Sequence, residues 1–115
     1  MTATGKIAVK ARFSEVPKST KRRIFQMIDK AFLNKNKRYQ FTDENKISYC
    51  VSFEEGKLLV SVVDDLPYPN ASILPMLVDR FGEPTMKYAK PHRFDPKATF
   101  FVMCWDDFFN KGIVH

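Results

Sequence analysis

Alternation of apolar and polar side chains predicts four extended segments. Residues 7–13 alternate in this way, which is the period of a strand with one buried face. Residues 46–53 alternate again, and a Glu-Gly pair turns the chain into the apolar residues 57–63, which predicts a hairpin. The stretch ATFFVMCW, residues 98–105, has the β-branched and aromatic content of a final strand.

Helical spacing predicts two helices between these strands. Apolar residues recur three and four positions apart between Pro17 and Lys35, which is the pattern of an amphipathic helix; they are Ile24, Phe25, Ile28, Ala31 and Phe32. A second, shorter helix is predicted over residues 73–81, ILPMLVDRF, with Gly82 as its stop.

The order β-α-β-β-α-β predicts an α+β protein of the ferredoxin-like split βαβ arrangement. In this arrangement two helices cover one face of a four-stranded antiparallel sheet. Right-handed crossovers place the first strand between the third and the fourth. The residues RYQF, 38–41, are a candidate for an extra edge strand, and the Pro-punctuated residues 83–97 are expected to form a loop. We expect residues 1–115 to form a single domain.

Composition and charge narrow the choice of partner. Hydrophobic residues make up 44% of the chain, enough for a core and against disorder. The net charge is +6, and residues 1–40 hold eleven Lys or Arg against two acidic residues, a local charge of +9. The remaining residues hold eight against eleven, a charge of −3. Basicity concentrated in this way indicates an anionic partner.

The sequence lacks the features that would indicate secretion, a membrane span or a metal site. The first residues have no continuous apolar stretch of a secretory signal, so the protein is expected in the cytoplasm. The apolar runs are far shorter than the roughly 20 residues that span a bilayer, and no membrane partner is expected. Cys50 and Cys104 stand 54 positions apart with no second ligand nearby, so we expect two free thiols, no metal and no cofactor.

The start of the first helix is the first candidate binding surface. It carries cations where the helix dipole favours negative charge, and Lys30 extends the charge along the helix; the residues are Lys18, Lys21, Arg22, Arg23 and Lys30. First-turn N–H groups together with such side chains favour a phosphate. The alternative is a solvated helix face with surplus cations.

The stretch MKYAKPHRFDPK, residues 86–97, is the second candidate surface. It interleaves cations with aromatic rings; the expected contacts are Lys87, Tyr88, Lys90, Arg93 and Phe94. Grooves for single-stranded nucleic acid have this composition. The alternative is a surface loop whose rings pack at the edge of the core. In the predicted topology this loop lies at the same end of the molecule as the start of the first helix.

The sheet face opposite the helices is the third candidate surface. If the apolar residues of 7–13 face the helices, Lys10 and Arg12 lie on this open face. Four small polar residues are expected beside them: Ser48, Cys50, Ser52 and Ser61. This face is therefore predicted to be polar and basic.

Two acidic pairs, Asp64-Asp65 and Asp106-Asp107, follow apolar strands. The predicted topology makes these strands parallel with one strand between them, so the pairs would lie about 10 Å apart at one edge. A divalent-metal nuclease is one interpretation. We prefer solvated carboxylates at strand ends, because no histidine supports either pair.

These observations favour a small, basic, non-catalytic protein that binds the phosphates of RNA or DNA. The alternative is a protein-interaction module, an inhibitor or adaptor, that docks its basic end on an acidic protein. The apolar residues at the C-terminus could form an exposed patch, cap the core or make a homodimer seam; they are Phe108, Phe109, Ile113 and Val114.

Overall fold

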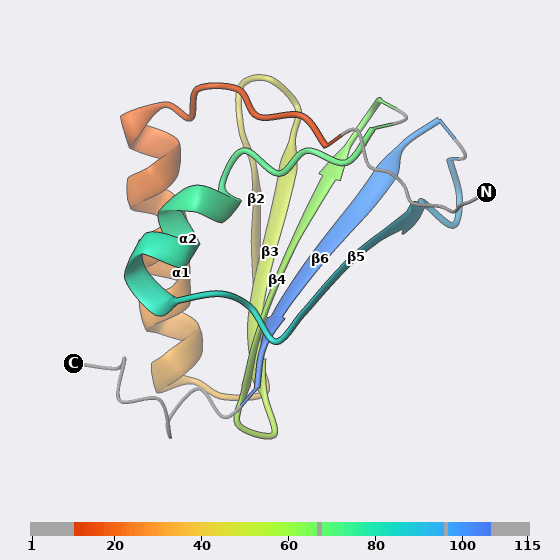
Figure 1. Ribbon diagram of the computed structural model, residues 1–115. Coiled ribbons are helices and arrows are strands. Elements are labelled where there is room, and N and C mark those ends of the chain that lie inside the picture. Colours follow the sequence, from red (N-terminus) through yellow and green to blue (C-terminus); the bar gives the residue numbers. More distant parts are fainter. Residues whose placement is uncertain (1–10, 67, 96, 107–115) are drawn as a thin grey trace.

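Two helices cover one face of a five-stranded antiparallel sheet (Figure 1). The computed structural model describes residues 11–66, 68–95 and 97–106. The elements are α1 (Lys18–Leu33), β2 (Arg38–Thr42), β3 (Ser48–Glu54), β4 (Lys57–Asp64), α2 (Leu74–Phe81), β5 (Met86–Pro91) and β6 (Thr99–Trp105). The strands lie in the order β2-β3-β4-β6-β5, and every neighbouring pair is antiparallel. The predicted α+β class with both helices on one face is confirmed.

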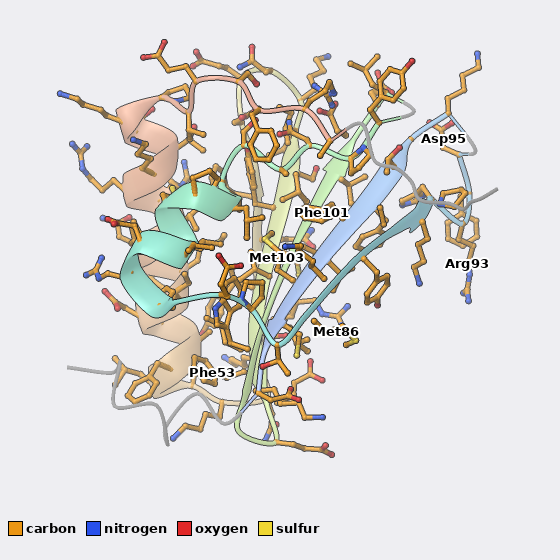
Figure 2. The ribbon with its side chains drawn as sticks, viewed as in Figure 1. Phe53, Met86, Arg93, Asp95, Phe101 and Met103 are labelled. Atoms are coloured by element: carbon orange, nitrogen blue, oxygen red, sulfur yellow. The ribbon has the colours of Figure 1, made fainter. Side chains whose placement is uncertain are left out.

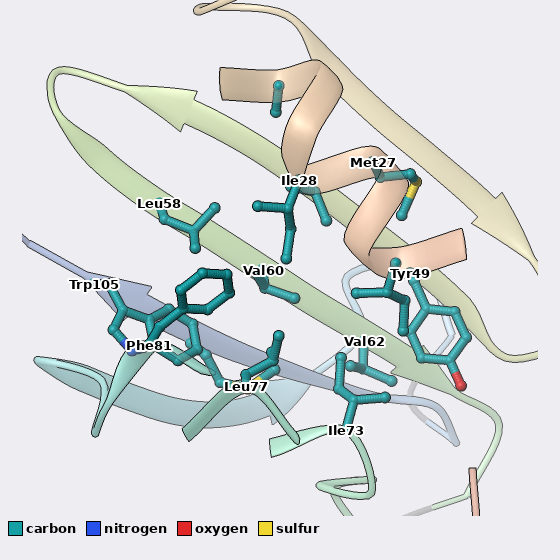
Figure 3. Packing of buried hydrophobic residues seen from close by; sticks show 14 of the residues in the cluster. Met27, Ile28, Tyr49, Leu58, Val60, Val62, Ile73, Leu77, Phe81 and Trp105 are labelled. Carbon is teal, nitrogen blue, oxygen red and sulfur yellow. The ribbon is translucent and has the colours of Figure 1, made fainter. Parts of the chain in front are cut away.

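Helix α1 forms because its apolar residues return to one side. Ile24, Met27, Ile28 and Ala31 are buried on that side, at the spacing that aligns side chains along a helix. They pack on β3 and β2, and Figure 3 shows Met27 and Ile28 facing the core. The opposite side of α1 carries its charged residues. Neither of the described helices combines the length and the apolar character needed to cross a membrane.

The central strands alternate between the two faces of the sheet, although Ser52 of β3 and Cys104 of β6 are buried on the open face as well. Along β4, Leu58, Val60 and Val62 are buried toward the helices, while Leu59 and Ser61 between them are half-buried on the open face. Strands β3 and β6 follow the same period. Figure 2 shows Phe53, Phe101 and Met103 between the sheet and the helices. The core therefore lies between this face and α1 and α2.

Helix α2 is anchored at its end by a buried tryptophan. Gly82 follows the helix with a φ of 85°, a conformation that glycine adopts without strain. The indole Nε1–H of Trp105 donates a hydrogen bond of 2.8 Å to the Gly82 carbonyl. Phe81 packs edge-to-face on the same ring, as Figure 3 shows. The last strand and the end of α2 are thus fixed together.

Strand β5 corrects the expectation of a loop and of four strands. Met86–Pro91 pairs with β6 along its whole length. Its side chains are all exposed, so buried and exposed residues do not alternate along it. Its lysines and terminal proline are features of an edge strand. The edge strand considered at 38–41 is confirmed as β2, which pairs with β3.

The position expected for the first strand is also corrected. Strand β4 pairs directly with β6, so no strand lies between them. Residues 7–10 lie outside the described residues. Arg12 makes an isolated parallel bridge to Asn70. The four-stranded ferredoxin-like order is thus not what the described residues form, because a period of two predicts a strand but does not choose its neighbours.

Candidate nucleic-acid interface

One cluster of expected contacts lies on α1. We call Lys18, Lys21, Arg22, Arg23 and Lys30 the α1 basic surface; all five are exposed. No acidic residue occupies the first turn, so nothing there compensates the cations. The Arg23 guanidinium lies 4.8 Å from the centre of the Phe41 ring, within cation–π range. Arg23 therefore also contributes to packing.

A second cluster lies on β5 and the turn after it. We call Lys87, Tyr88, Lys90, Arg93 and Phe94 the β5 basic edge. Its two rings remain in solvent, since Tyr88 is 43% and Phe94 is 83% exposed. Lys90 Nζ lies 6.0 Å from the Tyr88 ring centre, and the Arg93 guanidinium lies 6.0 Å from that of Phe94. The rings do not pack into the core, and cations stand beside both.

These two surfaces do not form the single basic end that the sequence suggested. Helix α1 packs on β2 and β3, whereas β5 is the opposite edge of the sheet. Four strand spacings separate β2 from β5, roughly 19 Å, and Figure 1 shows α1 at the left, beside β2, and β5 as the right-hand edge of the sheet. The two surfaces are therefore separate. The predicted proximity failed because β5 replaced a loop and the sheet has a different strand order.

Arg12 occupies a different place from the open face where we expected it. Its guanidinium donates to the carboxylate of Asp64, which is buried on the helix-covered face of β4. Asn70 donates a second hydrogen bond to Asp64, at 2.9 Å. The Arg12 backbone also bonds Pro69 and Ala71, at 2.8 and 2.9 Å. Arg12 therefore links the segment before α1 to the end of β4, and the Asp64 carboxylate already compensates its charge.

The ionisation of Asp64 reflects this arrangement. Burial by itself raises its pKa, but hydrogen bonds from Arg12, Asn70 and the Asp65 N–H, with the Arg12 charge, outweigh burial and lower it. The carboxylate is thus held in its charged form. Lys10, the other cation expected on the open face, lies outside the described residues.

The open face is hollowed between β2 and β5. We call this cavity, of about 440 Å³, the open-face hollow; it is lined mainly by Arg38, Gln40, Ser48, Cys50, Ser52, Glu54, Leu59, Ser61, Val63, Tyr88, His92, Phe100 and Val102. The four small polar residues expected on this face are among them. Sequence reasoning missed Arg38, Gln40 and Phe100, because their approach depends on strand order and register.

Cys50 and Cys104 are both free thiols. Burial raises the pKa of Cys50, against the opposing charge of Arg38. Burial also raises the pKa of Cys104 to about 11, helped by its contact with Asp106. Both thiols are therefore protonated at neutral pH, which makes them weak nucleophiles.

The acidic pairs are far apart, which corrects the geometry expected for them. In the β4–β6 ladder, Asp64 is opposite Thr99, and Leu58 at the other end is opposite Trp105. Asp106 follows Trp105, so roughly 20 Å of strand separates Asp64 from Asp106. Within the described ranges, no three metal-binding side chains gather into one site. Asp107 and the apolar C-terminal residues lie outside those ranges.

Comparison of the chain with models of known protein families, with curated proteins and with solved structures finds no match. The functional argument therefore depends on the geometry of this chain alone.

Proposed function

We propose that the protein binds single-stranded nucleic acid, RNA or DNA, through the β5 basic edge and has no catalytic activity. The observation that carries the proposal is the pairing of exposed rings with cations along this edge. Cations bind the phosphates of a single strand and exposed rings stack on its bases. Each of these rings has a cation about 6.0 Å from its centre, so one short segment offers both kinds of contact.

The α1 basic surface has a secondary place in this proposal. It offers cations but no exposed ring, and Phe41 beneath Arg23 is half-buried. Cations without rings attract phosphates without stacking on bases. We therefore assign the α1 basic surface at most a supporting electrostatic role.

Two alternatives are weaker. A nuclease that used both acidic pairs as one metal site loses its geometric basis, because Asp64 and Asp106 lie at opposite ends of the β4–β6 ladder. Docking on an acidic protein would use the same cations. The binding test described below therefore includes an acidic polymer as a competing ligand. Such docking offers no specific role for the exposed Phe94.

The test compares two matched double variants in binding to a fluorescent oligothymidylate, followed by anisotropy over a range of salt. Lys90→Glu with Arg93→Glu reverses one lysine and one arginine on the β5 basic edge. Lys21→Glu with Arg22→Glu makes the same charge change on the α1 basic surface.

We expect the β5 pair to weaken binding about tenfold or more and to reduce the salt slope by roughly 1.4, because single strands contribute about 0.7 per phosphate contact. The α1 pair should have the smaller effect. Unchanged affinity and slope in the β5 pair would contradict the proposal. Tighter binding of poly-glutamate than of any oligonucleotide would favour an acidic protein partner instead.

A further inference from the structure

The open-face hollow has two chemically different sides. Strands β5 and β6 and the residue after β5 contribute rings, from Tyr88, Phe100 and His92. Across the hollow, β2 and β3 contribute polar groups, among them Arg38, Gln40 and Ser48. Its volume of about 440 Å³ is within the range of sites for small organic groups. A ligand that fills it must therefore present both a flat apolar surface and a polar edge.

The aromatic side is built for stacking. The rings of His92 and Phe100 lie 5.9 Å apart and are nearly parallel, at 13°. The Phe94 N–H donates to His92 Nδ1, at 3.2 Å, which keeps the imidazole oriented. Lys90 Nζ lies 5.8 Å from the Phe100 ring centre and 6.0 Å from that of Tyr88. A phosphate-binding cation thus stands beside the rings that could hold a base.

The polar side has groups available for a ligand. Arg38 and Gln40 make no side-chain hydrogen bond within the part of the chain that the structure describes. Glu54, the acidic residue of the hollow, accepts a hydrogen bond from Ser52 at 3.1 Å. The available groups are mainly a guanidinium and an amide, which pair with the edges of nucleobases.

Other occupants fit less well. A second copy pairing antiparallel along the whole of β5 would set Lys87 opposite Lys90, a like-charge pair that opposes association. An apolar ligand would cover Arg38 and Gln40 without satisfying them, which is costly. An acidic peptide would match the cations but would not use the ring surfaces.

We propose that the open-face hollow receives two neighbouring unpaired bases of a single-stranded nucleic acid, the first stacked against the rings of Tyr88 and the His92–Phe100 pair. Lys90 at the rim contacts the adjoining phosphate, and Arg38 and Gln40, three to four strand spacings away on β2, face the edge of the second base. This inference rests on the proposed function and goes further, because it assigns the bases to a defined place and not only the phosphates to a charged edge.

The first experiment compares an oligothymidylate of about a dozen nucleotides with an abasic oligomer of the same length and charge. Wild-type protein should bind the oligothymidylate about tenfold more tightly. Ser61→Phe, which fills the hollow and leaves every cation in place, should reduce this affinity to that of the abasic oligomer. Asn45→Phe is the matched control, because Asn45 is exposed in the turn between β2 and β3 and outside the hollow, and it should change neither affinity.

A second measurement uses unaltered protein, so it does not depend on how a variant folds. Cys50 lines the hollow, whereas Cys104 is 2% exposed and outside it. Saturating oligothymidylate should slow alkylation of Cys50 several-fold and leave that of Cys104 unchanged. The abasic oligomer at saturation should protect Cys50 less.

The outcomes separate the two proposals. A wild-type preference for the oligothymidylate that persists in Ser61→Phe, or equal protection of Cys50 by both oligomers, overturns the base site and leaves the proposed function standing. Equal affinity of wild-type protein for both oligomers overturns the base site and also the stacking of rings on bases in the proposed function. Absence of binding to either oligomer at low salt overturns the proposed function itself, and the base site with it.

Discussion

The two faces of the sheet are built from the same strands but have opposite characters. Toward the helices, β4 presents Val60 and Val62, which are fully buried. Toward the open face it presents Ser61 and Val63, which line the open-face hollow. Neighbouring residues of one strand thus serve two purposes. Stability should depend on one face and the proposed binding on the other, so that the effect of a substitution alternates along the chain.

Two adjacent phenylalanines of β6 give the largest expected contrast. Phe101 is 6% exposed on the helix-covered face, so Phe101→Ala should lower the free energy of unfolding by about 3–5 kcal/mol. Phe100 is half-buried in the hollow, and Phe100→Ala should cost less than half as much while weakening oligothymidylate binding. Urea denaturation and anisotropy measure the two effects. Equal losses of stability would show that the open face packs as tightly as the core.

The Arg12–Asp64 pair tests whether a charged contact on the helix-covered face also governs stability. Arg12→Ala leaves the Asp64 carboxylate buried without its cation, a loss of about 3–5 kcal/mol for fully buried pairs. Because the Arg12 side chain is 29% exposed, we expect about 2 kcal/mol after allowing for solvent screening. Arg22→Ala is the exposed control and should change the free energy of unfolding by less than about 0.5 kcal/mol. Similar changes in the free energy of unfolding for Arg12→Ala and Arg22→Ala would show that Arg12 has no structural role.

The same pair predicts a pH dependence of stability. The pKa of Asp64 is lower in the folded protein than its ordinary value near 3.9. The unfolded chain therefore binds a proton first as the pH falls, and the stability contributed by Asp64 is full well above pH 4 and is lost as the pH falls through the folded pKa. Asp64→Asn should consequently destabilise the protein more at pH 7 than at about pH 3. A difference from wild type that is independent of pH in urea denaturation would contradict this assignment.

The two ends of α1 give the smallest expected effects, since Lys18 and Lys30 are both exposed. Lys18→Glu in the first turn should stabilise the protein by about 0.3–1 kcal/mol, and Lys30→Glu in the last turn should destabilise it by a similar amount, because of the helix dipole. Thermal unfolding at low and high salt measures the two stability changes, and added salt should make each of them smaller. Equal signs would mean that local contacts of these side chains outweigh the dipole.

Local periodicity determined much of the fold and part of the candidate interface. Helices near residues 18–33 and 74–81, the hairpin of β3 and β4, and β6 all follow from the spacing of apolar residues, because that spacing is set by the geometry of each element alone. The exposed cations and rings of the β5 basic edge were selected by composition, which does not require knowledge of strand neighbours. The small polar residues of the open face followed from alternation.

Only the tertiary structure determined which strands are neighbours and which side chains are in contact. Met86–Pro91 became a strand because β6 offered it a free edge, although its own side chains have no apolar period. Arg12 bonds to Asp64, 52 residues further along the chain, and therefore does not lie on the open face where the sequence pattern placed it. The hollow exists because five strands in a particular order and register bring Gln40, Phe100 and Tyr88 around one space. Such contacts depend on the packing of the whole chain, whereas a sequence period reports the face of a residue and not its neighbour.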